Sequence, residues 1–223
     1  MDRKFRDRAE AGTQLAQQLA DYAANCPVAI VLALPRGGVP VAAPIAQMLD
    51  VPLDICLVHK LGVPGNVEFA MGAIDLQGKR YLNDRIVADL QISAARIDRV
   101  AEIELRELQR RDRLYRGDRA SIDVRDSRSE RLRQRVVILV DDGLATGATM
   151  MAAVRVISWQ QPAQIVVAVP VADRRVVEQL RSSVDEVVCL LMPEPFYAIG
   201  SWYENFAQTS DAEVIALLNR SSL

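Results

Sequence analysis

The fold of this chain is decided by residues 136–150, which read Val136-Val137-Ile138-Leu139-Val140-Asp141-Asp142-Gly143-Leu144-Ala145-Thr146-Gly147-Ala148-Thr149-Met150. The apolar run at its start predicts a strand that is covered on both faces, as in a parallel sheet. Two carboxylates follow, and small residues then lead into a helical pattern. In a parallel α/β sheet this turn lies at the carboxyl end of a strand, where such folds bind ligands.

The rest of the chain repeats the alternation of strand and helix. Apolar runs predict strands at 28–34, 53–58, 135–140, 164–170 and 184–191. Helical patterns fall at about 8–24 and, as crossovers, at 39–49, 147–160 and 173–182. This order predicts an α/β, doubly wound, mostly parallel five-stranded sheet flanked by helices, and we expect residues 1–223 to form one domain.

Two segments interrupt this alternation. Residues 60–83 are rich in glycine and predict a lid formed by a loop or hairpin. Residues 93–116 predict a long charged helix, inserted between strands, that could serve as the arm of a homodimer. Its balanced charge favours a partly solvated packing arm over a nucleic-acid arm. Residues 117–134 are polar and basic, which is typical of a surface return to the central strand.

The composition excludes several classes of protein. Half of the residues are hydrophobic, a quarter are charged and the formal net charge is −2, which argues against a nucleic-acid or anionic-membrane binder. No apolar run has the length of a membrane helix, and the charged N-terminus does not resemble a signal peptide. The cysteines lie far apart in apolar stretches and there is a single histidine, so we expect a cytoplasmic protein without disulfides or zinc.

The turn after the central strand carries groups that suit a sugar phosphate. Thr146 to Thr149 would present backbone N–H groups, two hydroxyls and the positive end of a helix dipole to a phosphate monoester. Asp141 and Asp142 could accept hydrogen bonds from two sugar hydroxyls. The alternative is that the acids only cap the helix, but capping needs one acid and not two. Together these groups indicate a ribose 5-phosphate.

At these residues the chain resembles the type I phosphoribosyltransferases, which bind 5-phosphoribosyl-1-pyrophosphate (PRPP) through a strand, two acids and a Thr-Gly-x-Thr loop. The resemblance implies that Asp141 and Asp142 hold the ribose hydroxyls. It also implies that the loop after them cradles the 5-phosphate, through Gly143, Ala145, Thr146, Gly147, Ala148 and Thr149. The sequence contains no Walker-type phosphate loop.

A second loop, Leu34-Pro35-Arg36-Gly37-Gly38-Val39-Pro40, follows the first predicted strand. Two glycines let a backbone approach an anion closely, and Arg36 adds a charged donor. A glycine pair alone is equally consistent with a structural turn. The family places its pyrophosphate loop after this strand, so the resemblance implies that Arg36, Gly37 and Gly38 bind pyrophosphate.

The second predicted strand leads into the lid through His59-Lys60-Leu61-Gly62-Val63-Pro64-Gly65-Asn66-Val67-Glu68-Phe69-Ala70-Met71-Gly72-Ala73. This segment resembles a bacterial subgroup of the family, and the resemblance does not specify which acceptor the subgroup uses. We expect Lys60 to contact pyrophosphate and His59 to be structural. Enzymes of the family that act on 6-oxopurines usually carry an acid immediately before the Thr-Gly of the motif. In this chain the position is Ala145, which resembles the adenine-type enzymes. Glu68 could supply a proton acceptor from the lid, or be a surface carboxylate.

Residues 193–206 contain a cluster of aromatic side chains after the last predicted strand. Such a cluster could stack on a flat heterocycle, or form a small satellite core, as we expect for Phe206. The family covers its base with a hood built from variable terminal segments, so Phe196, Tyr197 and Trp202 are the hood candidates.

The resemblance implies transfer of the 5-phosphoribosyl group from PRPP to a nitrogen nucleophile, for which a nucleobase is the first choice. We expect Lys60, Glu68 and Asp142 to be the catalytic residues. Mg²⁺ would be held through PRPP oxygens, without direct protein ligands. A non-catalytic PRPP or nucleotide sensor remains the alternative, because a binding motif can outlast activity. A PRPP synthetase relative would need an ATP site and a longer, duplicated chain.

Overall fold

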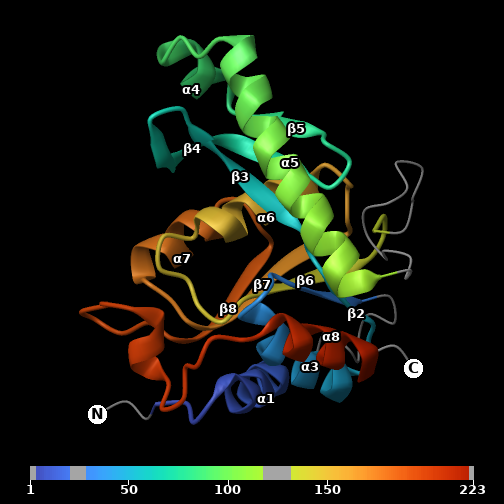
Figure 1. Cartoon of the computed structure of the whole chain (residues 1–223). Coiled ribbons are helices and arrows are strands. Elements are labelled where there is room, and N and C mark those ends of the chain that lie inside the picture. The colour runs from blue at the N-terminus through green and yellow to red at the C-terminus, as the bar shows by residue number, and fades with distance from the viewer. Residues whose placement is uncertain (1–3, 21–28, 118–131, 221–223) are drawn as a thin grey trace.

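The structure is a computed structural model that describes residues 4–20, 29–117 and 132–220. Its centre is a parallel sheet of five strands in the order β2-β1-β6-β7-β8 (Figure 1). The strands are β1 (Ile30–Ala33), β2 (Leu53–Ile55), β6 (Val136–Val140), β7 (Gln164–Val171) and β8 (Glu186–Leu191). The predicted parallel sheet is therefore confirmed.

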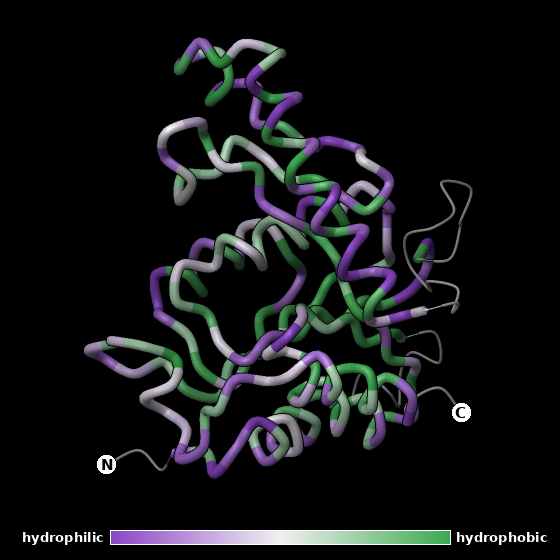
Figure 2. The backbone as a smooth tube through the Cα atoms, in the orientation of Figure 1, coloured by the Kyte–Doolittle hydropathy of each residue, from purple (hydrophilic) through white to green (hydrophobic). Residues whose placement is uncertain are grey.

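Helices cover both faces of this sheet, as the unbroken apolar runs of its strands require. On one side lie α1 (Arg8–Gln18), α3 (Gly38–Leu49) and α8 (Asp211–Arg220), and on the other lie α6 (Ala148–Ser158) and α7 (Arg174–Arg181) (Figure 1). Alternate residues of β1 face the two sides: Val31 and Ala33 enter one core cluster, Ile30 and Leu32 the other. In Figure 2 the central strands are accordingly drawn in the green of hydrophobic residues.

The strand order creates a switch point between β1 and β6. The two strands are parallel neighbours, with Ala33 paired to Val140. From β1 the chain crosses through α3 to β2 at one edge, whereas from β6 it crosses through α6 to β7 in the opposite direction. The crossovers that leave the two strands therefore run in opposite directions, and doubly wound folds bind ligands at such a switch point.

The segment predicted as a lid forms a second, antiparallel sheet of three strands in the order β3-β4-β5. Its strands are β3 (Val58–Val63), β4 (Asn66–Asp75) and β5 (Arg80–Leu82). The apolar run predicted as one strand over 53–58 is in fact divided, since β2 ends at Ile55 and β3 begins at Val58. Cys56 N–H still donates to Ala33 O (2.9 Å) before the chain leaves the parallel sheet.

The predicted long helix is confirmed as α5 (Ala94–Arg116), which follows the short helix α4 (Asp84–Asp89) and lies across β3 and β4 (Figure 1). Its far end is fixed to β2 by a buried ion-pair cluster. Arg116 contacts Asp54 (3.1 Å) and Asp112 (2.6 Å), and its Nη2 donates to Ile55 O (2.7 Å). This cluster ties the base of the inserted helix to the central sheet.

Two boundaries differ from the sequence prediction. The helix predicted at about 8–24 is α1, which ends at Gln18, and residues 21–28 lie outside the described part of the chain. Most of the polar return predicted at 117–134 also lies outside it, because residues 118–131 are not described. Within the described ranges, no helix has the length and apolar character needed to cross a membrane.

Candidate functional site

The two loops at the switch point touch each other. A β-carbon placed on Gly37 would lie 2.1 Å from Asp142 Oδ2, and one on Gly38 would lie 2.6 Å from Val140 O. Packing alone therefore explains why both positions are glycine, so the glycine pair by itself does not favour an anion site. The position of the loop is what favours a ligand site, because it follows the carboxyl end of β1 at the switch point, where doubly wound folds bind ligands.

The loop between β6 and α6 presents its polar groups to solvent. Ala145, Thr146 and Thr149 are exposed, whereas Gly147 is buried with a φ of +68°. Gly147 is required there, because that backbone conformation is unfavourable for other residues and a β-carbon would lie 2.4 Å from Val176 Cγ1. The turn leads directly into the first residues of α6, and a helix N-terminus is a favourable place for a phosphate.

The acid pair is largely withdrawn from water. Burial, together with the neighbouring charge of Asp142, raises the pKa of Asp141 well above its usual range. Burial also raises the pKa of Asp142, and the guanidinium of Arg8 opposes that rise. Asp141 Oδ1 accepts a hydrogen bond from the backbone N–H of Asp142 (2.9 Å), which fixes the orientation of the first carboxylate.

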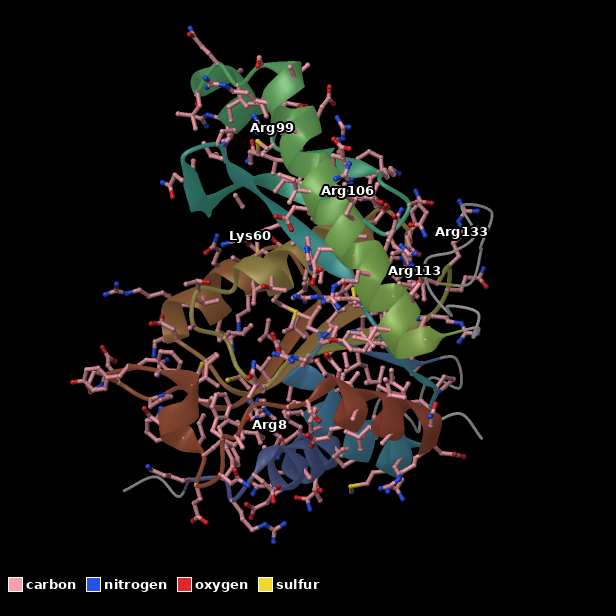
Figure 3. All side chains as sticks on the ribbon, in the orientation of Figure 1. Arg8, Lys60, Arg99, Arg106, Arg113 and Arg133 are labelled. Carbon is pink, nitrogen blue, oxygen red and sulfur yellow. The ribbon has the colours of Figure 1, made fainter. Side chains whose placement is uncertain are left out.

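Arg8 is a residue of this site that the sequence analysis missed. From the first turn of α1, its Nε and Nη2 each lie 2.8 Å from Asp142 Oδ2. Figure 3 places Arg8 beside α1 and the C-terminal segment, whereas Lys60 lies on β3. The sequence holds no local signal for this contact, because Arg8 sits in a run of alternating charges 134 positions before Asp142.

The aromatic segment predicted as a hood or satellite core lies against the acid pair. Tyr203, which was not among the hood candidates, donates from its hydroxyl to the backbone carbonyl of Asp142 (2.7 Å). Burial and the charge of Asp142 raise the pKa of Tyr203. The rings of Phe5 and Phe206 lie 5.5 and 5.0 Å from the ring of Tyr203. A satellite core therefore exists, and it includes Phe206 as expected.

The three hood candidates differ in exposure. Phe196 and Trp202 are half-buried at the edge of the satellite core, whereas Tyr197 is 84% exposed. Ile199 covers the acid-pair turn, since a β-carbon on Gly143 would lie 2.7 Å from its Cγ2. The segment thus flanks the site, and a role in binding an acceptor stays a prediction.

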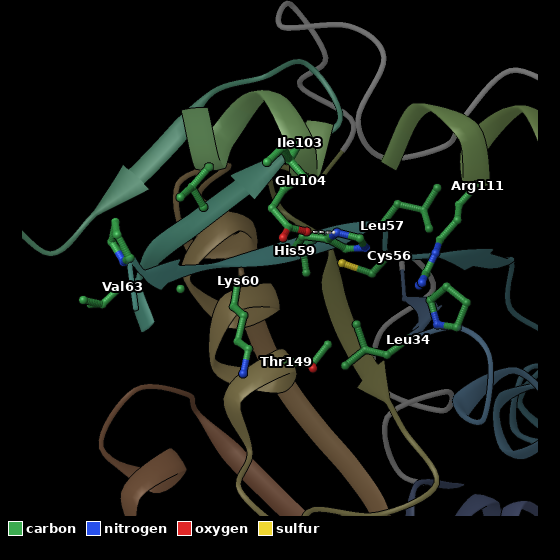
Figure 4. Close-up of a pocket in the computed structure, with 15 residues that line it drawn as sticks. Leu34, Cys56, Leu57, His59, Lys60, Val63, Ile103, Glu104, Arg111 and Thr149 are labelled. Atoms are coloured by element: carbon green, nitrogen blue, oxygen red, sulfur yellow. Dashed lines mark hydrogen bonds and ion pairs between the residues drawn. The ribbon is translucent and has the colours of Figure 1, made fainter. Parts of the chain in front are cut away.

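A cavity of about 550 Å³ lies between β3, α5 and the first turn of α6 (Figure 4). Lys60 and Thr149 both line it, so the structure brings the lid lysine and the first turn of α6 to one cavity. Its walls are largely apolar; they include Leu34, Val58, Val63, Val100 and Ile103. In the close-up, the Lys60 side chain extends toward Thr149.

His59 joins the lid to the inserted helix. Its Nδ1 lies 2.7 Å from Glu104 Oε2 on α5. Burial lowers the pKa of His59, although Glu104 opposes this effect. The contact supports the structural role expected for His59. Glu68 belongs to β4, but its side chain is outside the described part of the structure, so its proposed role as proton acceptor stays a prediction.

Arg36 extends toward the start of α8. Its Nη1 lies 3.7 Å from Asp211 Oδ1, which also accepts a hydrogen bond from the hydroxyl of Tyr115 on α5 (2.8 Å). Asp211 therefore connects the pyrophosphate-loop candidate with the inserted helix. Among the described residues, no three His, Cys, Asp or Glu side chains gather as a group that could hold a metal ion.

Comparisons with known proteins agree on one family. The model of the phosphoribosyl transferase domain matches residues 5–209. Two Mycobacterium tuberculosis proteins, from strains H37Rv and CDC 1551 and both named "Putative phosphoribosyl transferase", are 45% identical over 217 residues. The match covers 97% of this chain and 47% of theirs, so the chain spans about half the length of these curated relatives.

A solved structure shares the fold closely. It is the crystal structure of TT1426 from Thermus thermophilus, which is 38% identical with a TM-score of 0.86. The alignment covers 99% of this chain and 100% of that one. The inserted helix and lid sheet therefore lie within the length that the two proteins share.

Proposed function

The chain belongs to the phosphoribosyl transferase family, and from that premise we propose that it transfers the 5-phosphoribosyl group of PRPP to a nitrogen nucleophile and releases pyrophosphate. One observation carries the proposal: the pairing of Ala33 with Val140 sets the 34–38 loop, the acid pair and the exposed phosphate loop side by side. These are the groups that a ribose bearing a phosphate and a pyrophosphate needs.

Each part of PRPP has a matching place. The N–H groups of residues 145–149, with the hydroxyls of Thr146 and Thr149, would bind the 5-phosphate at the start of α6. Asp141 and Asp142 would accept hydrogen bonds from the ribose hydroxyls. The loop of Arg36, Gly37 and Gly38 would face the pyrophosphate, with Arg36 as a charged donor, while the Gly38 N–H donates to Leu34 O (3.0 Å) and shapes the turn.

Catalysis would come from charge stabilisation and positioning. When the bond between the anomeric carbon and pyrophosphate breaks, positive charge grows on the ribose and negative charge grows on the leaving oxygen. Lys60 and Arg36 would stabilise the leaving group, and the carboxylate of Asp142 would hold the ribose. Mg²⁺ held through PRPP oxygens would neutralise part of the pyrophosphate charge.

The acceptor would approach the ribose from the side opposite the cavity that Lys60 lines. The segment that contains Phe196, Tyr197 and Trp202 lies next to the acid pair, which it contacts through Ile199 and Tyr203. We propose a small nitrogenous acceptor with a flat ring, such as a nucleobase, because aromatic side chains stack on such rings. Glu68 is the proposed proton acceptor of the lid, and Ala145 favours an adenine-type pattern over a 6-oxopurine one.

The proposal is tested by measuring pyrophosphate release from magnesium-PRPP with a panel of nucleobases and small amines. Release that depends on one acceptor would establish the transferase and identify its substrate. Saturable PRPP binding without release for any acceptor would instead favour a sensor. Failure to bind magnesium-PRPP at all would contradict both.

A further inference from the structure

Arg8, on α1, is held against the acid pair Asp141 and Asp142, which lies in the loop after β6. Its Nε and Nη2 both approach one oxygen of Asp142, Oδ2, at 2.8 Å. Both groups are nearly buried, with 11% and 14% of their side chains exposed. Because the ion pair uses Oδ2 alone, the second oxygen, Oδ1, lies outside it.

The same guanidinium also holds the C-terminal segment. Nη1 of Arg8 donates to Ala207 O (2.8 Å), and its guanidinium carbon lies 3.9 Å from the ring centroid of Phe206. Tyr203 completes the connection from the other direction, since its hydroxyl donates to the backbone carbonyl of Asp142 (2.7 Å). Arg8 therefore links α1, the acid pair and the segment that flanks the acceptor side.

The backbone around Arg8 is itself held in place. Phe5 N–H donates to Trp202 O (2.9 Å), and Glu204 N–H donates to Phe5 O (2.8 Å). Asp7 caps α1 by accepting a hydrogen bond from Glu10 N–H (2.8 Å). An arginine on a segment fixed at both ends loses little freedom when it binds a carboxylate, so it is well suited to orient one.

We propose that Arg8 is a positioning residue for PRPP, which fixes Asp142 through Oδ2, leaves Oδ1 to accept a ribose hydroxyl, and joins this carboxylate to residues 203–207. The inference rests on the proposed function, since it assigns Arg8 a task at the ribose site. Arg8 acts through Asp142 and need not touch the substrate.

The charges around the acid pair predict a pH dependence of PRPP binding that a purely packing role of Arg8 would not produce. Burial raises the pKa of both acids, and Arg8 lowers the pKa of each. The groups that face the pair are Arg8 from α1 and Tyr203 from the C-terminal segment, while Arg36 of the adjoining loop extends to Asp211 instead. Loss of the Arg8 charge should therefore favour protonation of the pair, and a protonated acid is a weaker acceptor for a hydroxyl.

The experiment is calorimetric titration of magnesium-PRPP into the full chain, from pH 6 to pH 9, for wild type, Arg8→Gln, Arg8→Lys and Arg6→Gln. Arg6 is the matched control, because it lies in the same segment with a side chain that is 70% exposed and paired to Asp7. Thermal unfolding of each variant at the same pH values reports its stability separately.

Arg8→Gln is expected to weaken PRPP binding about tenfold or more at pH 7, and the loss should become smaller as the pH rises, because higher pH favours the ionised acids. Arg8→Lys keeps the charge without the two-nitrogen contact, so it should bind more weakly than wild type with an unchanged pH profile. Arg6→Gln should match wild type. If Arg8→Gln does not fold, the affinity and pH profile of Arg8→Lys carry the test.

Three results would overturn the inference alone, with wild type still binding PRPP. The first is an affinity of the Arg8 variants equal to that of Arg6→Gln. The second is tighter binding, which would make Arg8 an inhibitory contact. The third is a loss for Arg8→Gln that is the same at every pH and follows lower thermal stability. Failure of wild type to bind PRPP would overturn the proposed function together with this inference.

Discussion

Gly37 and Asp142 are in contact at the switch point of the sheet: a β-carbon on Gly37 would lie 2.1 Å from Asp142 Oδ2. That oxygen is also the one that Arg8 holds at 2.8 Å. One carboxylate oxygen is thus enclosed by the loop after β1 and by the guanidinium from α1. The orientation of Asp142 consequently depends on two segments that are far from it in the sequence.

Gly37→Ala is expected to displace the Asp142 carboxylate and to destabilise the fold by about 1–3 kcal/mol, because the added methyl group has no room. Denaturant unfolding measures this effect, and the Asp142→Ala background isolates its cause. With the carboxylate removed, the cost of Gly37→Ala should fall, since the clashing atoms are gone. An equal cost in both backgrounds would show that the carboxylate is not what makes glycine necessary.

Asp142→Asn is expected to weaken magnesium-PRPP binding at least about tenfold, because the ribose hydroxyl loses a charged acceptor and Arg8 loses its partner. Calorimetry measures the affinity. Asp98→Asn is the matched control, as Asp98 pairs with Arg80 on the exposed side of α5. Unchanged affinity in Asp142→Asn would remove this residue from the ribose site.

The parts of the fold that could be predicted rest on local patterns. The run from Val136 to Val140 is apolar at every position, and Asp141 and Asp142 end it abruptly. A strand and its carboxyl end are therefore readable without knowledge of other segments. The division of the apolar run at 53–58 into two strands could not be predicted, because Cys56 and Leu57, which lie between the strands, are apolar and buried like the strand residues. There the chain changes sheets without a change in hydropathy.

The parts of the site that could not be predicted depend on contacts between distant segments. Arg8 resembles its charged neighbours in the sequence, and only the pairing of Phe5 with Tyr203 brings it to Asp142. Tyr203 and Tyr197 are likewise equivalent in an aromatic-rich segment, yet one is buried against Asp142 and the other is 84% exposed. Residue type alone does not distinguish such positions, because tertiary packing decides them.

Asp141→Asn is expected to stabilise the protein at pH 8 and to do so less at pH 5. Burial and Asp142 raise the folded-state pKa of Asp141 above its unfolded value, so the folded state binds more protons than the unfolded state between the two values. Stability conferred by the protonated acid is then lost as the pH rises through that range. Asparagine is not subject to this loss and keeps an oxygen for the Asp142 N–H.

Denaturant unfolding of wild type and Asp141→Asn at pH 5 and pH 8 measures the difference, and each unit of pKa shift corresponds to about 1.4 kcal/mol. The PRPP affinity of the same variant should fall, because asparagine lacks the charged oxygens that would accept a ribose hydroxyl. A gain in stability with a loss of binding is the trade-off expected of a residue kept for function. A variant no more stable than wild type at pH 8 would contradict the assigned direction.

Lys60→Ala is expected to lower the turnover number by about tenfold to a hundredfold while changing PRPP affinity much less. The reason is that negative charge on the pyrophosphate grows as its bond to the ribose breaks, so a cation directed at the leaving group contributes most at that stage. Single-turnover kinetics with the acceptor found by the pyrophosphate-release panel, together with calorimetry, separate the two effects. Lys79→Ala is the matched control, because Lys79 lies over the ring of Trp159 at 4.6 Å, and Trp159 does not line the cavity that contains Lys60. Equal losses in turnover and affinity for Lys60→Ala would make Lys60 a residue that binds PRPP in its ground state, and would leave Arg36 as the proposed cation for the leaving group.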